Sequence, residues 1–212
     1  MTPAAEPPRT RLLFLRHAEV QEDFHRVFGG RLDIALSARG RLQAGQLADY
    51  AARRFQPDAL HASPMQRVRE TLAPLLARTG LTPVFDDGLR EVDFGAWTGL
   101  RWEQIEERFG VTAFDWLDQL EQGLIPDAEP PDLFRDRVER ALNEILAAQA
   151  GRTVAVACHG GVIRMALAIL LELPLRKMTH LEVEYASVTW VNHRPGKIEL
   201  QLHNFAPWRD LA

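Results

Sequence analysis

Residues 11–17 of the sequence read RLLFLRH, a run of apolar residues that ends abruptly in an arginine and a histidine. A short run without polar alternation is typical of a strand in the middle of a parallel sheet, because helices cover both faces of such a sheet. Residues 153–161, TVAVACHGG, repeat the pattern, with a histidine and two glycines directly after the apolar run. Two such strands favour an α/β fold.

The segments between and after these runs alternate between helix-like and strand-like patterns. Ser37 can cap one helix, and Ser63-Pro64 can supply the cap and first position of another that Gly80 closes. Further helices are expected at 101–109, 113–121, 132–149 and from the two glycines to 171, and strands at 58–62, 82–85, 187–192 and 198–203. The pattern predicts an α/β three-layer sandwich: a mostly parallel central sheet with helices on both faces and a C-terminal antiparallel hairpin.

Composition and charge are those of an ordinary globular chain. Of 212 residues, 46% are hydrophobic, and 25 basic against 29 acidic residues leave a net charge of −4. Such a chain has no broad electrostatic attraction for nucleic acid or anionic membranes, and it contains no run of about 18 apolar residues that would span a membrane. Residues 1–10 are expected to be a flexible leader, and residues 11–212 a single domain.

The cysteine and histidine pattern excludes two kinds of site. Cys158 is the only cysteine, so no internal disulfide can form, which favours a reducing, cytoplasmic setting. The histidines show no HExxH spacing and no CxxC pair accompanies them, so no zinc site is predicted. A GxxxxGK[ST] phosphate loop is also absent.

Three polar clusters follow three of the expected strands. Arg16-His17 follows the first, residues 63–69 follow the second, and His159 with its glycines follows the third. The carboxyl ends of parallel strands share one rim of a sheet, so these clusters are expected to meet. Arginine forks and free N–H groups at helix N-termini both suit a phosphate. The sequence therefore predicts an anion site with two histidines, Arg16 and Arg67.

Each of these residues also has a structural explanation. Taken singly, Arg16 or Arg67 is better explained by a surface ion pair and Glu91 by a solvated carboxylate in a charged loop. The glycines after His159 would serve a strand-to-helix turn. A functional site is favoured because the clusters occur together, in order, at the ends of strands.

Five blocks carry a resemblance to a known family. They are residues 13–19 (LFLRHAE), 30–40 (GRLDIALSARG), 63–71 (SPMQRVRET), 89–99 (LREVDFGAWTG) and 159–161 (HGG). The first resembles the Arg-His-Gly signature of the histidine phosphatase superfamily, which includes the cofactor-dependent phosphoglycerate mutases. The other blocks follow in the order of that family and extend the resemblance over about residues 11–165.

The resemblance implies a mechanism without metal or other cofactor. His17 would take the phosphoryl group as a phosphohistidine that water then hydrolyses, which replaces one difficult displacement by two easier ones. Glu91 would protonate the leaving oxygen and then accept a proton from the attacking water. The implied catalytic set is His17, Glu91, Arg16, Arg67 and His159. The implied substrate-binding set is Arg16, Asp23, Gly30, Arg67, His159 and Gly160.

Three positions depart from the family pattern. Ala18 stands where the signature has glycine, which requires a negative φ there. Asp23 stands where a phosphate-binding asparagine is usual, and Gly29 where a glutamine is common. A carboxylate near the phosphate would repel it, so Asp23→Asn is expected to raise kcat/KM if Asp23 faces the pocket.

Two features resemble phosphatases more than mutases. Family mutases are generally longer and close an insertion over the substrate to exclude water, whereas residues 99–138 here are short. Residues 94–99 (FGAWTG) are similar to broad-specificity or α-ribazole-type phosphatases. Glu129 partly matches a Gly-Glu-Ser element at the pocket mouth of such enzymes. Aromatic residues that are candidates for the pocket mouth, or for the core, are Trp97, Trp102, Phe114 and Trp116.

The expected partner is a small phosphorylated metabolite, with a sugar phosphate, a nucleotide-like phosphate and 3-phosphoglycerate all open. The expected assembly is a monomer or a homodimer, with the tail strands 181–204 as a candidate dimer edge. Phosphoglycerate mutase-type transfer, a catalytically weak phosphate-binding or scaffold protein, and a metal-dependent hydrolase remain alternatives. Hydrolysis that depends on His17 and persists in EDTA would separate them.

Overall fold

The structure is a computed structural model and describes residues 8–211. Six strands form one sheet in the order β3-β2-β4-β1-β5-β6. The strands are β1 (Thr10–Arg16), β2 (Ala59–Ala62), β3 (Val84–Phe85), β4 (Thr153–Cys158), β5 (Val188–Arg194) and β6 (Lys197–Phe205). The first four pair in parallel, while β5 runs antiparallel to β1 and to β6. The expected mixed sheet with a terminal hairpin is confirmed.

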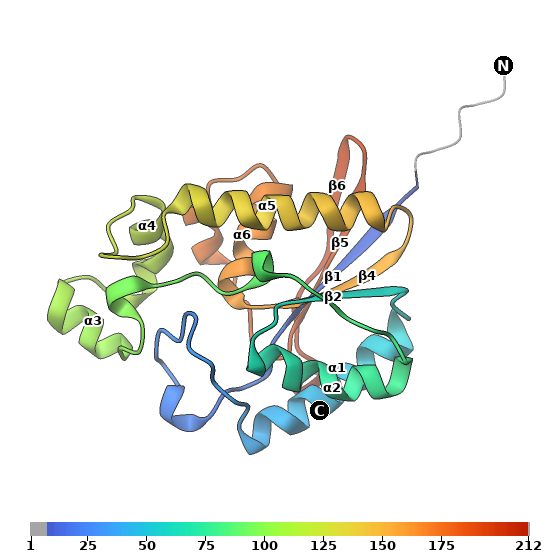
Figure 1. The fold of residues 1–212 in the computed structure, drawn as a ribbon, viewed down its shortest axis with the longest axis horizontal. Helices are drawn as coiled ribbons and strands as arrows, with labels where there is room; N and C mark the ends of the chain where they lie inside the picture. Colours follow the sequence, from blue (N-terminus) through green and yellow to red (C-terminus); the bar gives the residue numbers. More distant parts are fainter. Residues whose placement is uncertain (1–7, 212) are drawn as a thin grey trace.

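Helices cover both faces of this sheet. The α-helices are α1 (Ala38–Arg54), α2 (Gln66–Thr79), α3 (Trp102–Phe109), α4 (Trp116–Glu121), α5 (Pro131–Ala148), α6 (Gly160–Leu170) and α7 (Pro207–Asp210). Figure 1 shows α5 and α6 on one side of the sheet and α1 and α2 on the other. The short 3₁₀ turns are η1 (Glu22–Phe24), η2 (Asp87–Leu89), η3 (Gly95–Trp97), η4 (Ala113–Asp115) and η5 (Leu175–His180).

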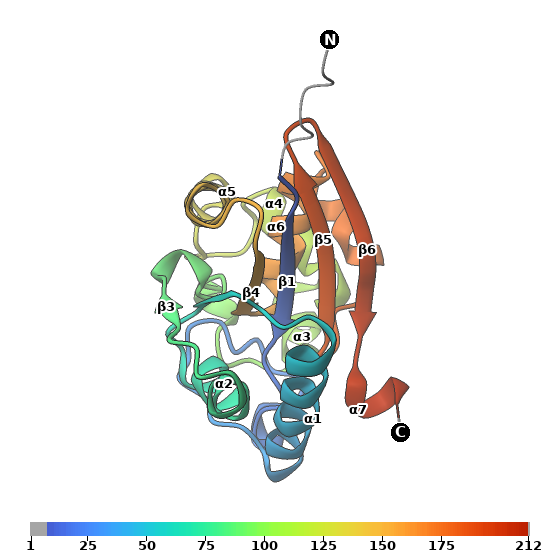
Figure 2. The same cartoon turned by 90° about the vertical axis from the view of Figure 1, so that its right-hand side faces the viewer.

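Strand β1 shows why the sheet needs both helical layers. Successive side chains of a strand point to opposite faces. Leu12 and Phe14 belong to the core under α5 and α6, whereas Leu13 and Leu15 belong to the core over α1 and α2. All four are at most 1% exposed. The continuous apolar run therefore reflects a strand with no solvent-facing side. Figure 2 shows β6 at one edge of this sheet.

The two predicted helix caps have different outcomes. Ser37 caps α1 as predicted, because its Oγ accepts a hydrogen bond from the Gly40 N–H at 2.8 Å. The prediction that Ser63 caps α2 is wrong, since Met65 is the N-cap and the helix begins at Gln66. The Ser63 hydroxyl is instead 2.8 Å from a ring nitrogen of His159.

Two further expectations concern the N-terminal leader and membrane-spanning segments. Residues 1–7 of the expected leader lie outside the described residues, and β1 begins at Thr10. Within residues 8–211, no helix combines the length and the apolar character that crossing a membrane requires.

Candidate active site

The parallel strand ends bring the predicted clusters together. Beyond the end of β1, the His17 N–H donates to the Cys158 carbonyl at 3.0 Å, and beyond β2 the Ser63 N–H donates to Ala157 at 2.9 Å. The hydrogen-bonded ladder thus continues one residue past the strands. It places His17 and Ser63 on either side of the end of β4, where His159 follows. The ring centroids of the two histidines are 5.2 Å apart.

The His17 ring leaves one nitrogen free. Its Nδ1 lies 2.9 Å from the Ala18 carbonyl oxygen, which can only accept, so Nδ1 carries the hydrogen and Nε2 keeps its lone pair. The pKa of His17 is far below its usual value of 6.5, chiefly because the ring is buried and also because Arg67 and Arg16 are close. At neutral pH the imidazole is therefore neutral, with a nucleophilic nitrogen available.

Arg67 is held by a side chain and by two carbonyls. Its Nε donates to His159 Nδ1 at 3.2 Å, while its two terminal nitrogens donate to Gly30 and Leu32 at 2.8 Å each. His159 Nε2 must then carry the hydrogen and donate to Ser63 Oγ. Burial above all, and then Arg67, lowers the pKa of His159. Burial also lowers the pKa of Arg67 to about 10, so its guanidinium stays charged at neutral pH.

His17, Ser63, Arg67 and His159 form the floor of the site. Two further arginines lie beside it. Arg16 donates to the Val183 carbonyl, and its guanidinium carbon lies 4.1 Å from the centre of the Tyr185 ring. Its Nε is buried without a hydrogen-bond partner among the described residues. Arg164 donates to the Gly160 carbonyl at 3.3 Å, and burial lowers its pKa to about 10. Together with Arg67 they concentrate positive charge beside His17.

Glu91 reaches the floor from a loop, and Gly161 makes room for its carboxylate. Glu91 Oε2 accepts from the Gly161 N–H at 3.1 Å, and Oε1 accepts from the Val92 N–H at 3.0 Å. A Cβ on Gly161 would collide with the Glu91 carboxylate, and one on Gly160 would lie 3.2 Å from Arg164. Neither glycine has a positive φ, so the turn-geometry explanation is wrong and space is the reason.

These groups open into a cavity of about 400 Å³. The predicted residues that line it are Arg16, His17, Gly30, Arg67, Glu91 and Gly160. His159 is fully buried behind them and touches the site through Arg67.

Asp23 is not brought to the cavity. It is exposed in η1, and its neighbour Phe24 lines the wall instead. The predicted repulsion of phosphate by Asp23 therefore has no support from the geometry. Ala18 has no positive φ, and its N–H donates to Thr71 Oγ1 at 2.9 Å, so the backbone accommodates this departure from glycine.

The outer wall of the cavity is largely aromatic. Residues 26–28 pair with 99–102 through a bridge between Val27 and Arg101, which places the loop beside α3 (Figure 1). The rings pack edge to face, with Trp102 against Phe114 at 5.3 Å. The aromatic residues of the wall are Phe24, Phe28, Phe94, Trp102, Phe114, Trp116 and Tyr185. Of the four candidates from the sequence, Trp97 is 1% exposed and belongs to the core, while the other three line the cavity.

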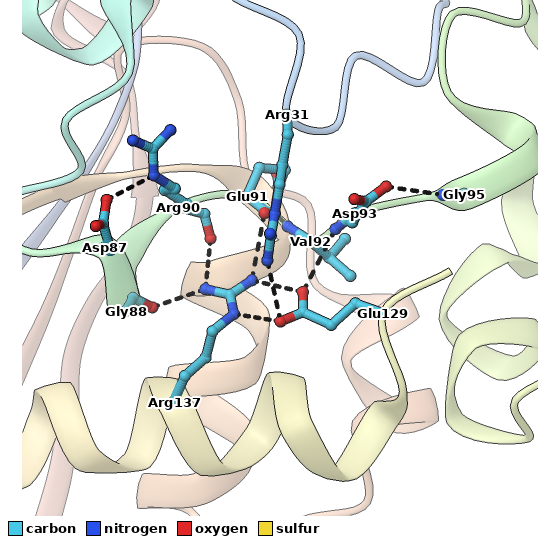
Figure 3. Close-up of polar contacts among 10 residues, drawn as sticks. All are labelled: Arg31, Asp87, Gly88, Arg90, Glu91, Val92, Asp93, Gly95, Glu129 and Arg137. Carbon is cyan, nitrogen blue, oxygen red and sulfur yellow. Dashed lines mark hydrogen bonds and ion pairs between the residues drawn. The ribbon is translucent and has the colours of Figure 1, made fainter. Parts of the chain in front are cut away.

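Several residues of the site escape the sequence reading. Arg164 follows Gly160 by one helical turn, a spacing that could have identified it. The sequence places Ser63 in the polar cluster 63–69 but assigns it no role beyond a helix cap, and Tyr185 has no sequence signal. Glu129 does not line the cavity but pairs with Arg137 behind Glu91 (Figure 3). Among residues 8–211, no group of three or more His, Cys, Asp or Glu side chains is arranged to hold a metal ion.

Comparison with known proteins identifies a matching family and several similar proteins. A model of the histidine phosphatase superfamily (branch 1) matches residues 12–206. A bifunctional protein of Mycobacterium tuberculosis is 34% identical over 180 residues, which are 85% of this chain and 49% of that protein. The chain thus spans about half the length of this curated relative. The glucosyl-3-phosphoglycerate phosphatase of the same organism is 31% identical over 172 residues, covering 78% of this chain and 77% of the relative.

Solved structures agree with this placement. The native mycobacterial glucosyl-3-phosphoglycerate phosphatase aligns with a TM-score of 0.82 and 29% identity, covering 93% of this chain and 99% of that one. The α-ribazole phosphatase of Shigella flexneri aligns with a TM-score of 0.79 over 92% of this chain and 96% of that one. At 23% identity, that second likeness supports the fold alone.

Proposed function

The chain belongs to the histidine phosphatase superfamily, and from this premise we propose that it is a phosphatase that hydrolyses phosphate monoesters through His17. The observation that carries the proposal is the neutral His17 ring, whose Nε2 keeps a free lone pair close to the charges of Arg16 and Arg67. Relatives named as phosphatases support the same reaction class.

In the first step, the His17 Nε2 lone pair forms a bond to phosphorus as the bond to the leaving oxygen breaks. Arg67 uses three of its five N–H donors on protein acceptors, and the remaining two are available for phosphoryl oxygens. Arg16 and Arg164, which also line the cavity, add further positive charge. Fixed cations of this kind stabilise the charge that spreads over the transferring group.

Glu91 supplies and recovers the proton. Its carboxyl group gives a proton to the leaving oxygen, so the alcohol departs neutral. The resulting carboxylate then takes a proton from water as that water attacks phosphorus and the bond to Nε2 breaks. Inorganic phosphate leaves, and both His17 and Glu91 return to their starting states.

The aromatic wall supports a substrate whose alcohol carries a ring. The floor provides charge for one phosphoryl group, whereas the mouth offers mainly apolar faces such as Phe114, which is 69% exposed. Stacking of a ring against such faces contributes about 0.5–1.5 kcal/mol per contact. Ring-bearing phosphates, including glycosylated ones, are therefore proposed as the substrate class in preference to small acyclic phosphates.

Four accompanying features belong to the proposal. The reaction runs without a metal, because arginines supply the charge; residues 11–212 act as one domain. The compartment is the cytoplasm, which the buried, unpaired Cys158 supports. The functional unit is a monomer or a homodimer, and the edge strand β6 is the surface on which a second copy would pair.

Hydrolysis of p-nitrophenyl phosphate, with and without EDTA, tests the function. The native protein is expected to release phosphate equally under both conditions, while His17→Ala is expected to lose at least about a thousandfold in kcat. A panel containing phenyl phosphate, sugar phosphates and 3-phosphoglycerate then ranks substrates and detects mutase activity. Turnover that is unchanged in His17→Ala would contradict the mechanism, and turnover abolished by EDTA would contradict metal independence.

A further inference from the structure

Arg137 makes five hydrogen bonds with its five N–H donors. Its Nε and one terminal nitrogen hold both oxygens of Glu129, at 2.6 and 2.8 Å. The other terminal nitrogen donates to the Gly88 and Arg90 carbonyls at 2.7 Å each, and the fifth bond reaches the Glu91 carbonyl at 3.2 Å. Figure 3 shows the guanidinium rising from α5 into this ring of acceptors.

The segment that receives these bonds has no regular secondary structure of its own. Residues 90–94 belong to neither a helix nor a strand, so no ladder of backbone bonds fixes them. Instead, the carbonyls of Gly88, Arg90 and Glu91 all accept hydrogen bonds from a single guanidinium. The Glu91 side chain is oriented by the Gly161 and Val92 N–H groups, but its backbone is oriented by Arg137.

Glu129 fixes the guanidinium in turn. The side chains of Arg137 and Glu129 are only 11% and 9% exposed, so this is a largely shielded, two-pronged ion pair. The Glu129 N–H donates to the Asp93 carbonyl at 2.9 Å, which ties the same loop a second time. A planar fork fits a carboxylate and several carbonyls at once, which a lysine ammonium cannot do.

The same carboxylate also pairs with an arginine of the loop that carries Gly30. Arg31 lies 3.2 Å from Glu129, between the two residues whose carbonyls accept from Arg67. Glu129 therefore joins the loop behind the phosphate floor to the loop that carries Glu91.

We propose that Arg137, oriented by Glu129, is a positioning residue that sets the distance from the Glu91 carboxyl group to the leaving oxygen. This inference rests on the proposed function. It predicts a defect confined to proton delivery, because Arg137 does not line the cavity and touches Glu91 only through its backbone carbonyl.

Two aryl phosphates of nearly equal shape separate proton delivery from other losses. Phenolate is a poor leaving group that needs a proton, whereas p-nitrophenolate departs readily without one. The ratio kcat/KM covers the steps up to departure of the alcohol, so it reports the donor role of Glu91 alone. The experiment measures kcat/KM for both esters in the native protein and in the variants Arg137→Met, Arg137→Lys, Glu129→Gln and Glu91→Gln.

The expected result for Arg137→Met is a loss of about 10- to 100-fold with phenyl phosphate and of at most about threefold with p-nitrophenyl phosphate, the pattern expected of Glu91→Gln as well. Arg137→Lys keeps the charge and is expected to recover little. A double variant with Glu91→Gln is expected to be no worse than Glu91→Gln alone. The matched control is Arg135→Met on the same helix, whose exposed side chain pairs with Glu139 and should leave both rates unchanged.

Equal losses with both esters, or full recovery in Arg137→Lys, would overturn the proposal in favour of a structural or purely electrostatic role. If Arg137→Met does not fold, as judged by thermal unfolding, Glu129→Gln decides by the same comparison. Native protein that hydrolyses neither ester would sink the proposed function itself and this inference with it, an outcome distinct from a wrong leaving-group pattern.

Discussion

The floor of the cavity and the loop that carries Glu91 are built by different means. The floor stands on β1, β2 and β4, where regular backbone pairing delivers His17, Ser63 and His159 to neighbouring positions. The Glu91 loop has no regular backbone pairing and is held by hydrogen bonds from Arg137 and Glu129 and by the burial of Val92 and Phe94. The residues of the floor follow directly from strand ends, and the proposed proton donor lies on a segment that side chains hold in place.

The largest loss of activity is expected from a change in the floor of the cavity. Arg67→Met removes the charge and three hydrogen bonds, and kcat/KM for any phosphate monoester is expected to fall about 100- to 1,000-fold, as on loss of a donor to a reacting oxyanion. Arg69→Met, on the same helix but over the exposed Phe85, is the matched control and should stay within twofold. A fall of similar size in the control would mean that α2 itself is disturbed.

The next effect tests the loop. Gly161→Ala places a methyl group against the Glu91 carboxylate, so kcat/KM for phenyl phosphate is expected to fall about tenfold to a hundredfold while p-nitrophenyl phosphate is affected less. Gly45→Ala is the control, since a Cβ there meets nothing within 4 Å, and a helix-interior alanine stabilises by roughly 0.5–1 kcal/mol. Normal rates in Gly161→Ala would show that the loop tolerates displacement of Glu91.

A smaller effect concerns the pH dependence of stability. His17 and His159 have pKa values well below 6.5 in the folded protein, so they stay neutral when an unfolded histidine takes up a proton. The unfolded state then binds more protons, and stability falls as the pH drops below about 6.5. Each such histidine costs up to about 1.4 kcal/mol per pH unit.

Urea unfolding between pH 7.5 and 5.5 measures this slope. His17→Asn is expected to flatten it by about 1 kcal/mol per pH unit. The exposed His180 replaced in the same way serves as the control and should leave the slope as it is. An unchanged slope in His17→Asn would mean that the folded ring takes up a proton as easily as the unfolded one.

The smallest effect is expected at Asp23. The sequence predicts that Asp23→Asn raises kcat/KM, but the exposed position of Asp23 outside the cavity now leads us to expect a change below twofold. Steady-state kinetics at low ionic strength, where long-range repulsion is least screened, give the strictest test. An increase of tenfold would place the carboxylate near the phosphate after all.

The fold and the floor could be predicted because their signals are local. Apolar runs identify β1 and β4, and strand-end geometry follows from parallel pairing, so Arg16, His17 and Arg67 were expected where they lie. The Arg137–Glu129 pair could not be predicted in this way, since it depends on how α5 packs behind the Glu91 loop. The same holds for Tyr185, whose ring centroid lies 5.5 Å from that of His17 only because the tertiary fold brings the two residues together.

Ser63 and Asp23 show the two ways in which a local signal misleads. Ser63 satisfies the pattern for a helix cap, yet its hydroxyl lies 2.8 Å from the buried His159 imidazole and accepts only a long bond, at 3.4 Å, from the Met65 N–H. Asp23 stands at the expected distance in sequence from His17, but η1 turns its side chain to solvent and presents Phe24 instead.

Cys158 lies at the end of β4, fully buried, and its burial raises the pKa of the thiol far above neutrality. A thiol that is protonated and shielded reacts poorly with alkylating and oxidising reagents. Because it is the only cysteine in the sequence, a second one introduced on the surface would be labelled selectively by a maleimide dye or spin probe. Movement of the Glu91 loop during turnover is then open to spectroscopic observation without first removing a native cysteine.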